Sequence, residues 1–326
     1  AAGERQFAAT GSAKRAFAGL AKSATGGYGL TVQSKAMQPR QPAFSATGLP
    51  IRRNRDGFTL VELMVVFAII GLLVGLLLPA LARSKGRAHE VHCRKNQRDL
   101  FLAWSMYADE NEGRLPAVKG GSFAGADRWV SGWLDFTSSP DNTNALYLTD
   151  ERFSQVGPYV SDAPAVYRCP SDRTTVNLAD GAHPRVRSVS MNCWLNYTGT
   201  EPIGEDEYRV FRNINSIFSP SPSELWVLID ERPDSINDGM FITNLKNRGN
   251  LAKLVDFPAG WHNRGAGITY ADGHSEIKRW EDERTTPELK PTQLLRLDVL
   301  SPGNRDVAWL QKHSSSRRSI PADGLQ

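Results

Sequence analysis

A 21-residue run from Phe58 to Leu78 limits most strongly what this chain can fold into. Apart from Thr59 and two glycines the run is apolar, and its one charged side chain is Glu62. An α-helix needs about 20 such residues to cross roughly 30 Å of hydrocarbon. Three arginines lie within residues 52–55, just before the run, and basic residues are retained on the cytoplasmic side of a membrane. The run therefore predicts a single-pass inner-membrane anchor with a cytoplasmic N-terminus and a periplasmic or extracellular C-terminal domain.

The charge of the chain is concentrated in its first 57 residues. This leader contains nine Lys or Arg and two acids, whereas the whole chain carries a net charge of +4, so the remainder is acidic. The basic pI thus belongs to the leader, and we expect no nucleic-acid partner. Small and polar residues dominate residues 1–50 and cannot bury enough apolar surface to offset the entropy of ordering. We predict a disordered basic leader that is removed from the protein.

Residues 57–62, Gly-Phe-Thr-Leu-Val-Glu, resemble the prepilin cleavage and methylation signature of type IV pilins and type II secretion pseudopilins. The resemblance implies that a prepilin peptidase cuts between Gly57 and Phe58, and that Phe58 becomes an N-methylated N-terminus. It also implies partners of two kinds, other pilin or pseudopilin subunits in a filament and membrane lipid. The leader departs from the family pattern in its length of 57 residues.

Glu62 is unusual because a carboxylate within a spanning helix costs about 2.5–3.5 kcal/mol on insertion scales. The resemblance implies that Glu62 meets the N-terminal ammonium of a neighbouring subunit, which offsets this cost and promotes assembly. The alternative is that Glu62 lies near the membrane interface and extends its carboxylate into the headgroup region.

Helical periodicity continues beyond the apolar run. Pro79 is expected to kink the helix, and six Lys or Arg follow between residues 83 and 98, where they either bind lipid headgroups or form a solvated face. Apolar residues then recur three and four positions apart, which predicts a face packed on a core. The members of this face are Val91, Leu100, Phe101, Ala103, Trp104 and Tyr107. We predict one long helix from Phe58 to Asp109, with residues 58–81 in the membrane and residues 82–112 amphipathic.

Short segments rich in Val, Ile, Tyr and Trp follow Pro116 and predict β-strands. They are residues 188–192, 225–229, 267–270 and 275–280, and Asp272-Gly273 between the last two is a strong hairpin signal. The predicted fold class is α+β and pilin-like. A long N-terminal helix packs on a C-terminal domain with an antiparallel β-sheet, at residues 113–313, and residues 314–326 form a flexible tail.

His262, nine further residues and Asp272-Gly273 resemble the H-x9-DG element of pilin-like proteins of Planctomycetes- and Verrucomicrobia-type bacteria. With residues 167–172, 188–192 and 229–231, this resemblance extends over residues 57–280, but it implies no activity. His262, Asp272 and His274 suggest a metal or acid–base site. We favour the alternative that Asp272-Gly273 forms a turn and His262 hydrogen-bonds across the hairpin.

The sequence contains no nucleophile elbow, phosphate loop or HExxH motif, so we predict that the protein is not an enzyme.

An acidic segment at residues 230–239 offers oxygen ligands of the kind that Ca²⁺ prefers. The candidate ligands are Asp230, Asp234, Asn237 and Asp238, and Ca²⁺ is the only cofactor that the sequence suggests. The resemblance adds support, because some pseudopilins bind calcium in a loop of the soluble domain. The spacing is not that of an EF-hand, and the favoured alternative is a solvated turn.

The chain has three cysteines, Cys93, Cys169 and Cys193. An exported domain lies in an oxidising compartment, but spacing alone does not distinguish the three pairings. The resemblance favours a Cys93–Cys169 disulfide, which would join the helix to the sheet domain and leave Cys193 unpaired. The spacing contains no C-x-x-C motif and no zinc-cluster pattern.

Two classes of function remain. The first is a structural subunit, a pseudopilin or minor pilin of a type II secretion or type IV pilus-like assembly. The second is a membrane-tethered binding protein or hydrolase that uses the same anchor. A carbohydrate ligand belongs to this second class because aromatic faces stack on sugars. The tryptophans that suggest it are Trp129, Trp133, Trp194, Trp226 and Trp261.

Overall fold

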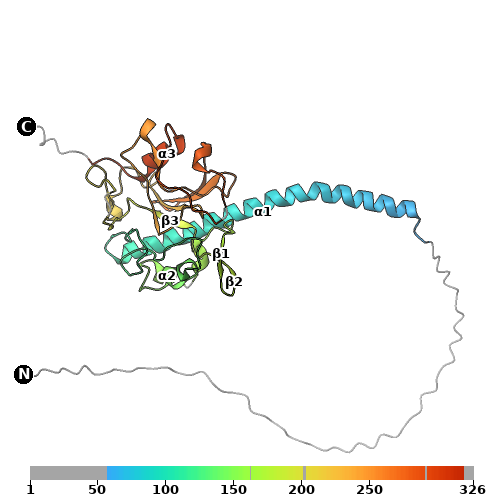
Figure 1. The fold of residues 1–326 in the computed structure, drawn as a ribbon, viewed down its shortest axis with the longest axis horizontal. Helices are drawn as coiled ribbons and strands as arrows, with labels where there is room; N and C mark the ends of the chain where they lie inside the picture. Colours follow the sequence, from blue (N-terminus) through green and yellow to red (C-terminus); the bar gives the residue numbers. More distant parts are fainter. Residues whose placement is uncertain (1–56, 162, 201–202, 291, 319–326) are drawn as a thin grey trace, which may run out of the picture. The chain divides into compact units, whose positions relative to one another are not determined.

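A 51-residue helix, α1 (Leu60–Glu110), is the longest element in the described part of the chain (Figure 1). The computed structural model describes residues 57–318 except 162, 201–202 and 291. The predicted leader therefore lies outside the described residues, apart from Gly57. The helix begins two residues later and ends one residue later than the sequence predicts, and it continues through Pro79.

The second half of α1 packs on the globular domain. Its buried residues recur three and four positions apart and include Cys93, Gln97, Leu100, Trp104 and Ala108. This periodicity confirms the predicted core-facing stripe for Leu100, Phe101, Ala103 and Trp104. Val91 was wrongly assigned to the stripe, because two residues before Cys93 it points away from the domain and is 58% exposed.

A glycine three residues beyond Glu110 marks the end of α1. Gly113 has a φ of +78°, a conformation that glycine adopts without steric cost, and its N–H donates to the carbonyl of Ala108 at 2.8 Å. This hydrogen bond satisfies one of the carbonyls that the end of a helix leaves without a partner.

A five-stranded sheet in the order β5-β3-β4-β7-β8 forms the centre of the domain. Its strands are β3 (Val189–Asn192), β4 (Trp226–Asp230), β5 (Met240–Phe241), β7 (Gly265–Tyr270) and β8 (Ser275–Arg279). The pairings are antiparallel except β3 with β5, which is parallel. Residues of β3, β4 and β7 are buried throughout, as expected for strands covered on both faces.

The two faces of the sheet have separate apolar cores. The core on one face contains Leu100 and Trp104 of α1 with Val227 of β4. The other contains Trp226 and Ile268 with Leu310 of α3 (Arg305–Ser314), a helix that the sequence did not predict. α1 and α3 therefore cover opposite faces of the sheet (Figure 1).

The remaining elements are short and lie around this sheet. They are α2 (Leu146–Thr149), β1 (Thr175–Leu178), β2 (Gly181–Pro184), β6 (Lys253–Leu254) and β9 (Val299–Leu300). Six 3₁₀ turns are η1 (Pro140–Asn142), η2 (Gly157–Tyr159), η3 (Pro164–Tyr167), η4 (Ile214–Ser216), η5 (Gly249–Leu251) and η6 (Glu283–Thr285).

The α+β prediction is confirmed, as are the four predicted strands, now β3, β4, β7 and β8. Asp272-Gly273 forms the β7–β8 turn, and Gly273 has a φ of +89°. The predicted tail is structured at its start: the N–H of Arg318 donates to Glu207, and Ser316 accepts from Arg209. Residues 319–326 lie outside the described residues.

Candidate functional site

The first part of α1 presents an apolar surface with no domain against it. Every described side chain from Phe58 to Leu81 is exposed, and among the large apolar ones Phe58, Leu60 and Leu76 are the most exposed, at 69–78%. By length and composition, α1 can cross a membrane. Glu62 lies in its first turn, where the positive end of the helix dipole favours a carboxylate.

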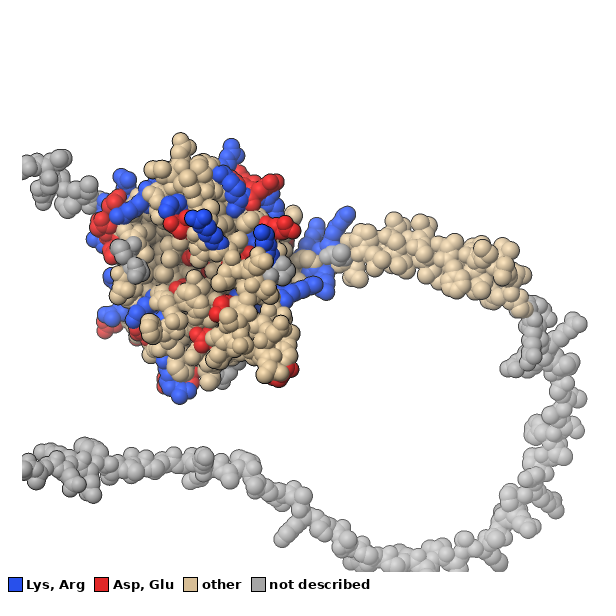
Figure 2. Space-filling view, viewed as in Figure 1, with Lys and Arg blue, Asp and Glu red and all other residues tan. Residues whose placement is uncertain are grey.

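A basic collar follows the apolar segment at the point where α1 meets the globular domain (Figure 2). It consists of Arg83, Lys85 and Arg87, all exposed. Basic side chains at this position suit the negatively charged headgroups of a membrane surface. The collar therefore marks the boundary between a segment suited to hydrocarbon and one suited to water.

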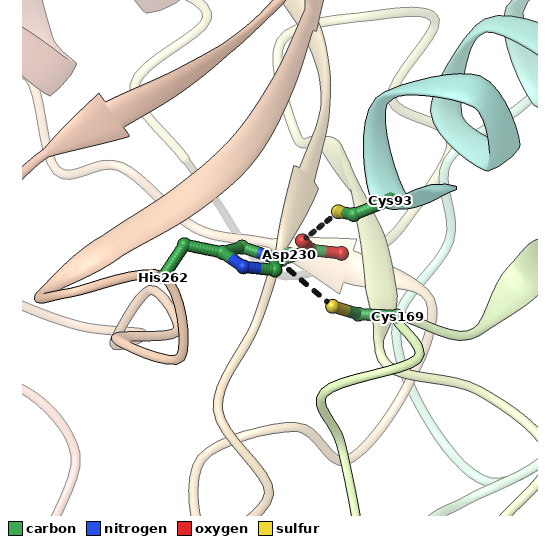
Figure 3. A group of neighbouring side chains, drawn as sticks. All are labelled: Cys93, Cys169, Asp230 and His262. Atoms are coloured by element: carbon green, nitrogen blue, oxygen red, sulfur yellow. Dashed lines mark hydrogen bonds between the residues drawn. The ribbon is translucent and has the colours of Figure 1, made fainter. Parts of the chain in front are cut away.

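A second candidate site lies within the domain, where four segments of the chain meet (Figure 3). Cys93 is on α1, Cys169 follows η3, Asp230 ends β4, and His262 precedes β7. All four are buried, and one ligand atom from each lies within 4.8 Å of the others. Cys93 Sγ is 2.8 Å from Asp230 Oδ2, and Cys169 Sγ is 3.2 Å from His262 Nε2. We call these four residues the Cys–Asp–His cluster.

Burial sets the protonation of the cluster. It raises the pKa of Asp230 to about 6 and lowers the pKa of His262, which favours a neutral imidazole at pH 7. Contact with Cys169, burial and the Asp230 carboxylate together raise the pKa of the Cys93 thiol. The cysteines are free thiols in the structure, so the Cys93–Cys169 disulfide is not formed there and stays a prediction.

The region that contains the apolar run is similar to a known protein family. Residues 52–78 match the family described as the prokaryotic N-terminal methylation motif. The chain carries a prepilin-type methylation motif. Its match covers the apolar run, Gly57 and Glu62, and confirms that the N-terminal region is type IV pilin-like.

Two curated pilins also match part of the chain. They are the type IV major pilin protein PilA of Myxococcus xanthus, 37% identical over 60 residues, and the type IV wide pilus major component PilA4 of Thermus thermophilus, 37% identical over 59 residues. Each alignment covers 18% of this chain, and 27% and 45% of the respective pilin. No solved structure matches the chain. The chain therefore spans less than half the length of either relative.

The H-x9-DG residues separate in space. Asp272 and His274 form an exposed pair across the β7–β8 turn, with 2.6 Å between His274 Nδ1 and Asp272 Oδ1. The His262 ring instead contacts Cys169, while the backbone carbonyl of His262 accepts from Arg279 of β8. The turn and the hydrogen bond across the hairpin thus fit the favoured alternative, but the contact of His262 with a thiol was not anticipated.

The four predicted calcium ligands do not gather into one site in the structure. Asp230 belongs to the Cys–Asp–His cluster, and Asp234 forms a two-point ion pair with Arg232. Asp238 accepts from the N–H groups of Gly121 and Met240, and Asn237 Oδ1 accepts from the N–H of Asp238. Asp234, Asn237 and Asp238 thus each already accept from a neighbouring group, and calcium binding stays a prediction.

The tryptophans offer little surface to a sugar. Trp129, Trp194 and Trp226 are buried in the apolar cores, and their indole N–H groups donate to Gly239, Thr243 and Ser314. Trp133 and Trp261 are partly exposed. A row of stacking aromatic faces would therefore lack three of its five predicted members.

Asp256 gives the domain a specific pH response. Burial raises the pKa of Asp256 to about 8, and one of its carboxylate oxygens, Oδ2, accepts from the N–H of Ile242 at 2.6 Å. The unfolded chain releases this proton near pH 4, whereas the folded domain retains it up to about pH 8. The folded state therefore binds more protons in this window, and the free energy of unfolding falls as the pH rises from about 4 to about 8.

The variant Asp256→Asn removes this titration and keeps an oxygen acceptor for Ile242. Its free energy of unfolding should fall less steeply between pH 4 and 8, by up to about 1.4 kcal/mol per pH unit. Urea unfolding of a fragment of residues 83–326 at several pH values measures the slope. Asp206→Asn, at an exposed acid, is the control and should match wild type. Equal slopes for wild type and Asp256→Asn would contradict the assignment.

Proposed function

We propose that this chain is a structural subunit, a pseudopilin or minor pilin, of a type IV pilus-like or type II secretion assembly. The supporting observation is the methylation motif joined to an exposed helix whose apolar segment carries one charge, Glu62. Such a surface is stable in hydrocarbon or against copies of the same helix.

Under this proposal a prepilin peptidase cuts the chain between Gly57 and Phe58 while α1 spans the inner membrane. The N-terminal end of α1 faces the cytoplasm, and the domain after the basic collar lies in the periplasm or outside the cell. The processed helix then leaves the bilayer and packs against other pilin or pseudopilin helices in a filament. The subunit has no catalytic role in this scheme.

The alternative is a membrane-tethered binding protein or hydrolase that uses the same anchor for display. The partly exposed Trp133 and Trp261 are what remains in favour of a carbohydrate ligand. This alternative predicts a domain function that does not depend on Glu62.

The variant Glu62→Ala distinguishes the two classes. In a filament it leaves the N-terminal ammonium of a neighbouring subunit without its carboxylate partner, at a cost comparable to the roughly 2.5–3.5 kcal/mol for a buried charge. We expect the variant to enter the membrane and be processed, while its recovery in sheared or cross-linked filaments falls at least about tenfold. Quantitative immunoblotting of the membrane and filament fractions measures both steps.

Asp109→Ala is the matched control, since Asp109 is an exposed acid on the same helix but lies beyond the apolar segment. It should assemble like wild type. If Glu62→Ala assembles as well as Asp109→Ala, the proposed role of Glu62 fails, and the tethered binding protein becomes the better description.

A further inference from the structure

We propose that Cys93, Cys169, Asp230 and His262 bind one Zn²⁺ ion that fastens α1 to the sheet domain. Two thiolates, an imidazole and a carboxylate form a donor set that Zn²⁺ accepts in tetrahedral sites. The proposal concerns the domain and does not depend on filament assembly.

The spacing of the donors suits one ion at the centre of the cluster. Zinc bonds of about 2.0–2.3 Å place the ligand atoms of a tetrahedral site about 3–4 Å apart. The contacts here are 2.8 Å between Cys93 Sγ and Asp230 Oδ2, and 3.2 Å between Cys169 Sγ and His262 Nε2. All four ligand atoms lie within 4.8 Å of one another, so shifts of side chains alone would complete the coordination. In Figure 3 the four side chains converge from separate segments.

One carboxylate oxygen of the cluster is buried without a hydrogen-bond partner among the described residues. This oxygen is Oδ1 of Asp230, which is fully buried. A buried carboxylate without a positive partner is costly, and a cation removes that cost. On binding, Zn²⁺ would displace one proton from each thiol to solvent.

Neighbouring groups keep the centre open and orient the ligands. A Cβ at Gly267 would lie 2.7 Å from Cys93 Sγ and 2.8 Å from Asp230 Oδ2, so only glycine leaves this space free. The N–H of Gly267 donates to Asp230 Oδ2, and Ser188 Oγ accepts from the N–H of Cys169. Such second contacts fix the direction in which ligands point.

Two surface pockets adjoin residues of the cluster. His262 lines a pocket of about 320 Å³ that also contains Arg83, Glu90 and Arg279. Cys169 lines a second pocket of about 570 Å³. The two pockets therefore lie beside His262 and Cys169, which contact each other within the cluster.

Because Cys93 lies on α1, a bound ion would join this helix to the domain. Cys93 is the first buried residue along the described part of α1, so it lies where the helix meets the domain. The other three ligands belong to the domain. One ion would join the apolar segment and the sheet at this junction, and four protein ligands would leave no open position for catalysis.

The test uses the full chain purified in detergent under reducing, chelator-free conditions. We expect about one zinc per chain by elemental mass spectrometry. Cobalt(II) added to the metal-free protein should give the visible bands of tetrahedral cobalt and an ultraviolet thiolate-to-cobalt charge-transfer band. Both readouts use the wild-type chain, so they do not depend on whether a variant folds.

Variants then assign the ligands. Cys93→Ser and His262→Gln should weaken metal binding at least about tenfold, and Cys93→Ser should reduce the thiolate charge-transfer band. Cys193→Ser is the matched control, because Cys193 is a buried thiol of the same domain outside the cluster. It should bind metal like wild type.

Three results would overturn the proposal. The first is reduced wild-type protein that binds neither zinc nor cobalt. The second is a Cys193→Ser variant that loses the metal to the same extent as Cys93→Ser. The third is protein isolated from cells whose mass and peptide map show a Cys93–Cys169 disulfide and whose reduced form binds no metal, which would support the disulfide predicted from sequence.

Discussion

Replacing Gly57 with Ala is expected to leave the leader attached to most of the protein. If a prepilin peptidase cuts between Gly57 and Phe58, a methyl group at residue 57 enters the peptidase at the bond that it must cleave. The chain itself tolerates this methyl group, because no atom lies within 4 Å of a Cβ built at Gly57. Any effect therefore reflects recognition by the peptidase. Intact mass spectrometry of membrane-extracted protein would show the unprocessed precursor in place of a form beginning with N-methyl-Phe58.

Gly75→Ala provides the control for this experiment. Gly75 lies within the same apolar segment, and a Cβ at this position would likewise meet no atom within 4 Å. Its protein should be processed and methylated like wild type. The proposed cleavage site would be wrong if Gly57→Ala gave the same mature mass as Gly75→Ala.

Replacing Trp104 with Ala should cost the domain about 3–5 kcal/mol of unfolding free energy. Trp104 is 1% exposed, stacks on Phe101 with 5.4 Å between ring centroids, and belongs to the apolar core that α1 shares with the sheet. The total free energy of unfolding of a globular domain is about 5–15 kcal/mol, so this loss would remove a large share of the domain's stability. Urea unfolding of residues 83–326, followed by circular dichroism, measures it. That fragment retains every buried residue described in the chain, since the first of them is Cys93.

Two further variants distinguish the contribution of side-chain packing at Trp104 from that of its indole N–H. The indole N–H of Trp104 is buried without a hydrogen-bond partner among the described residues. Trp104→Phe keeps an aromatic ring against Phe101 and removes that N–H, so it should cost much less than Trp104→Ala. Leu102→Ala, at a 51% exposed neighbour on α1, should stay within about 0.5 kcal/mol of wild type. Similar losses for Leu102→Ala and Trp104→Ala would contradict the packing assigned to α1.

The long helix and the β7–β8 hairpin could be predicted from the sequence because both depend on residues that are neighbours along the chain. The helix was predicted to within two residues at each end, and the β7–β8 hairpin followed from Asp272-Gly273 between two strand-forming segments. Val91 fits the same apolar composition yet faces solvent, because composition does not fix which side of a helix a residue occupies. α3 was missed because Arg305–Ser314 is mostly polar and owes its position to Leu310 and Trp309 packing under the sheet.

The Cys–Asp–His cluster was not readable as a unit. Cys93 and Asp230 are 137 residues apart, and Cys169 and His262 are 93 residues apart, so no local spacing relates them. The sequence signals were present separately: His262 stood in a recognised motif, Asp230 in an acidic segment, and Cys93 and Cys169 in a predicted pair. Their convergence depends on α1 packing against β7 and on β4 and β7 being neighbours in the sheet.

The sequence by itself determined the apolar helix, its single acid and the methylation motif, because each depends on the order of residues in one short segment. Only the tertiary structure decided that Asp230 belongs with two thiols and an imidazole rather than with the acids beside it in sequence. The physical reason is that hydrophobic burial on both faces of the sheet selects which distant segments meet. A side chain at the end of a buried strand takes its partners from those segments.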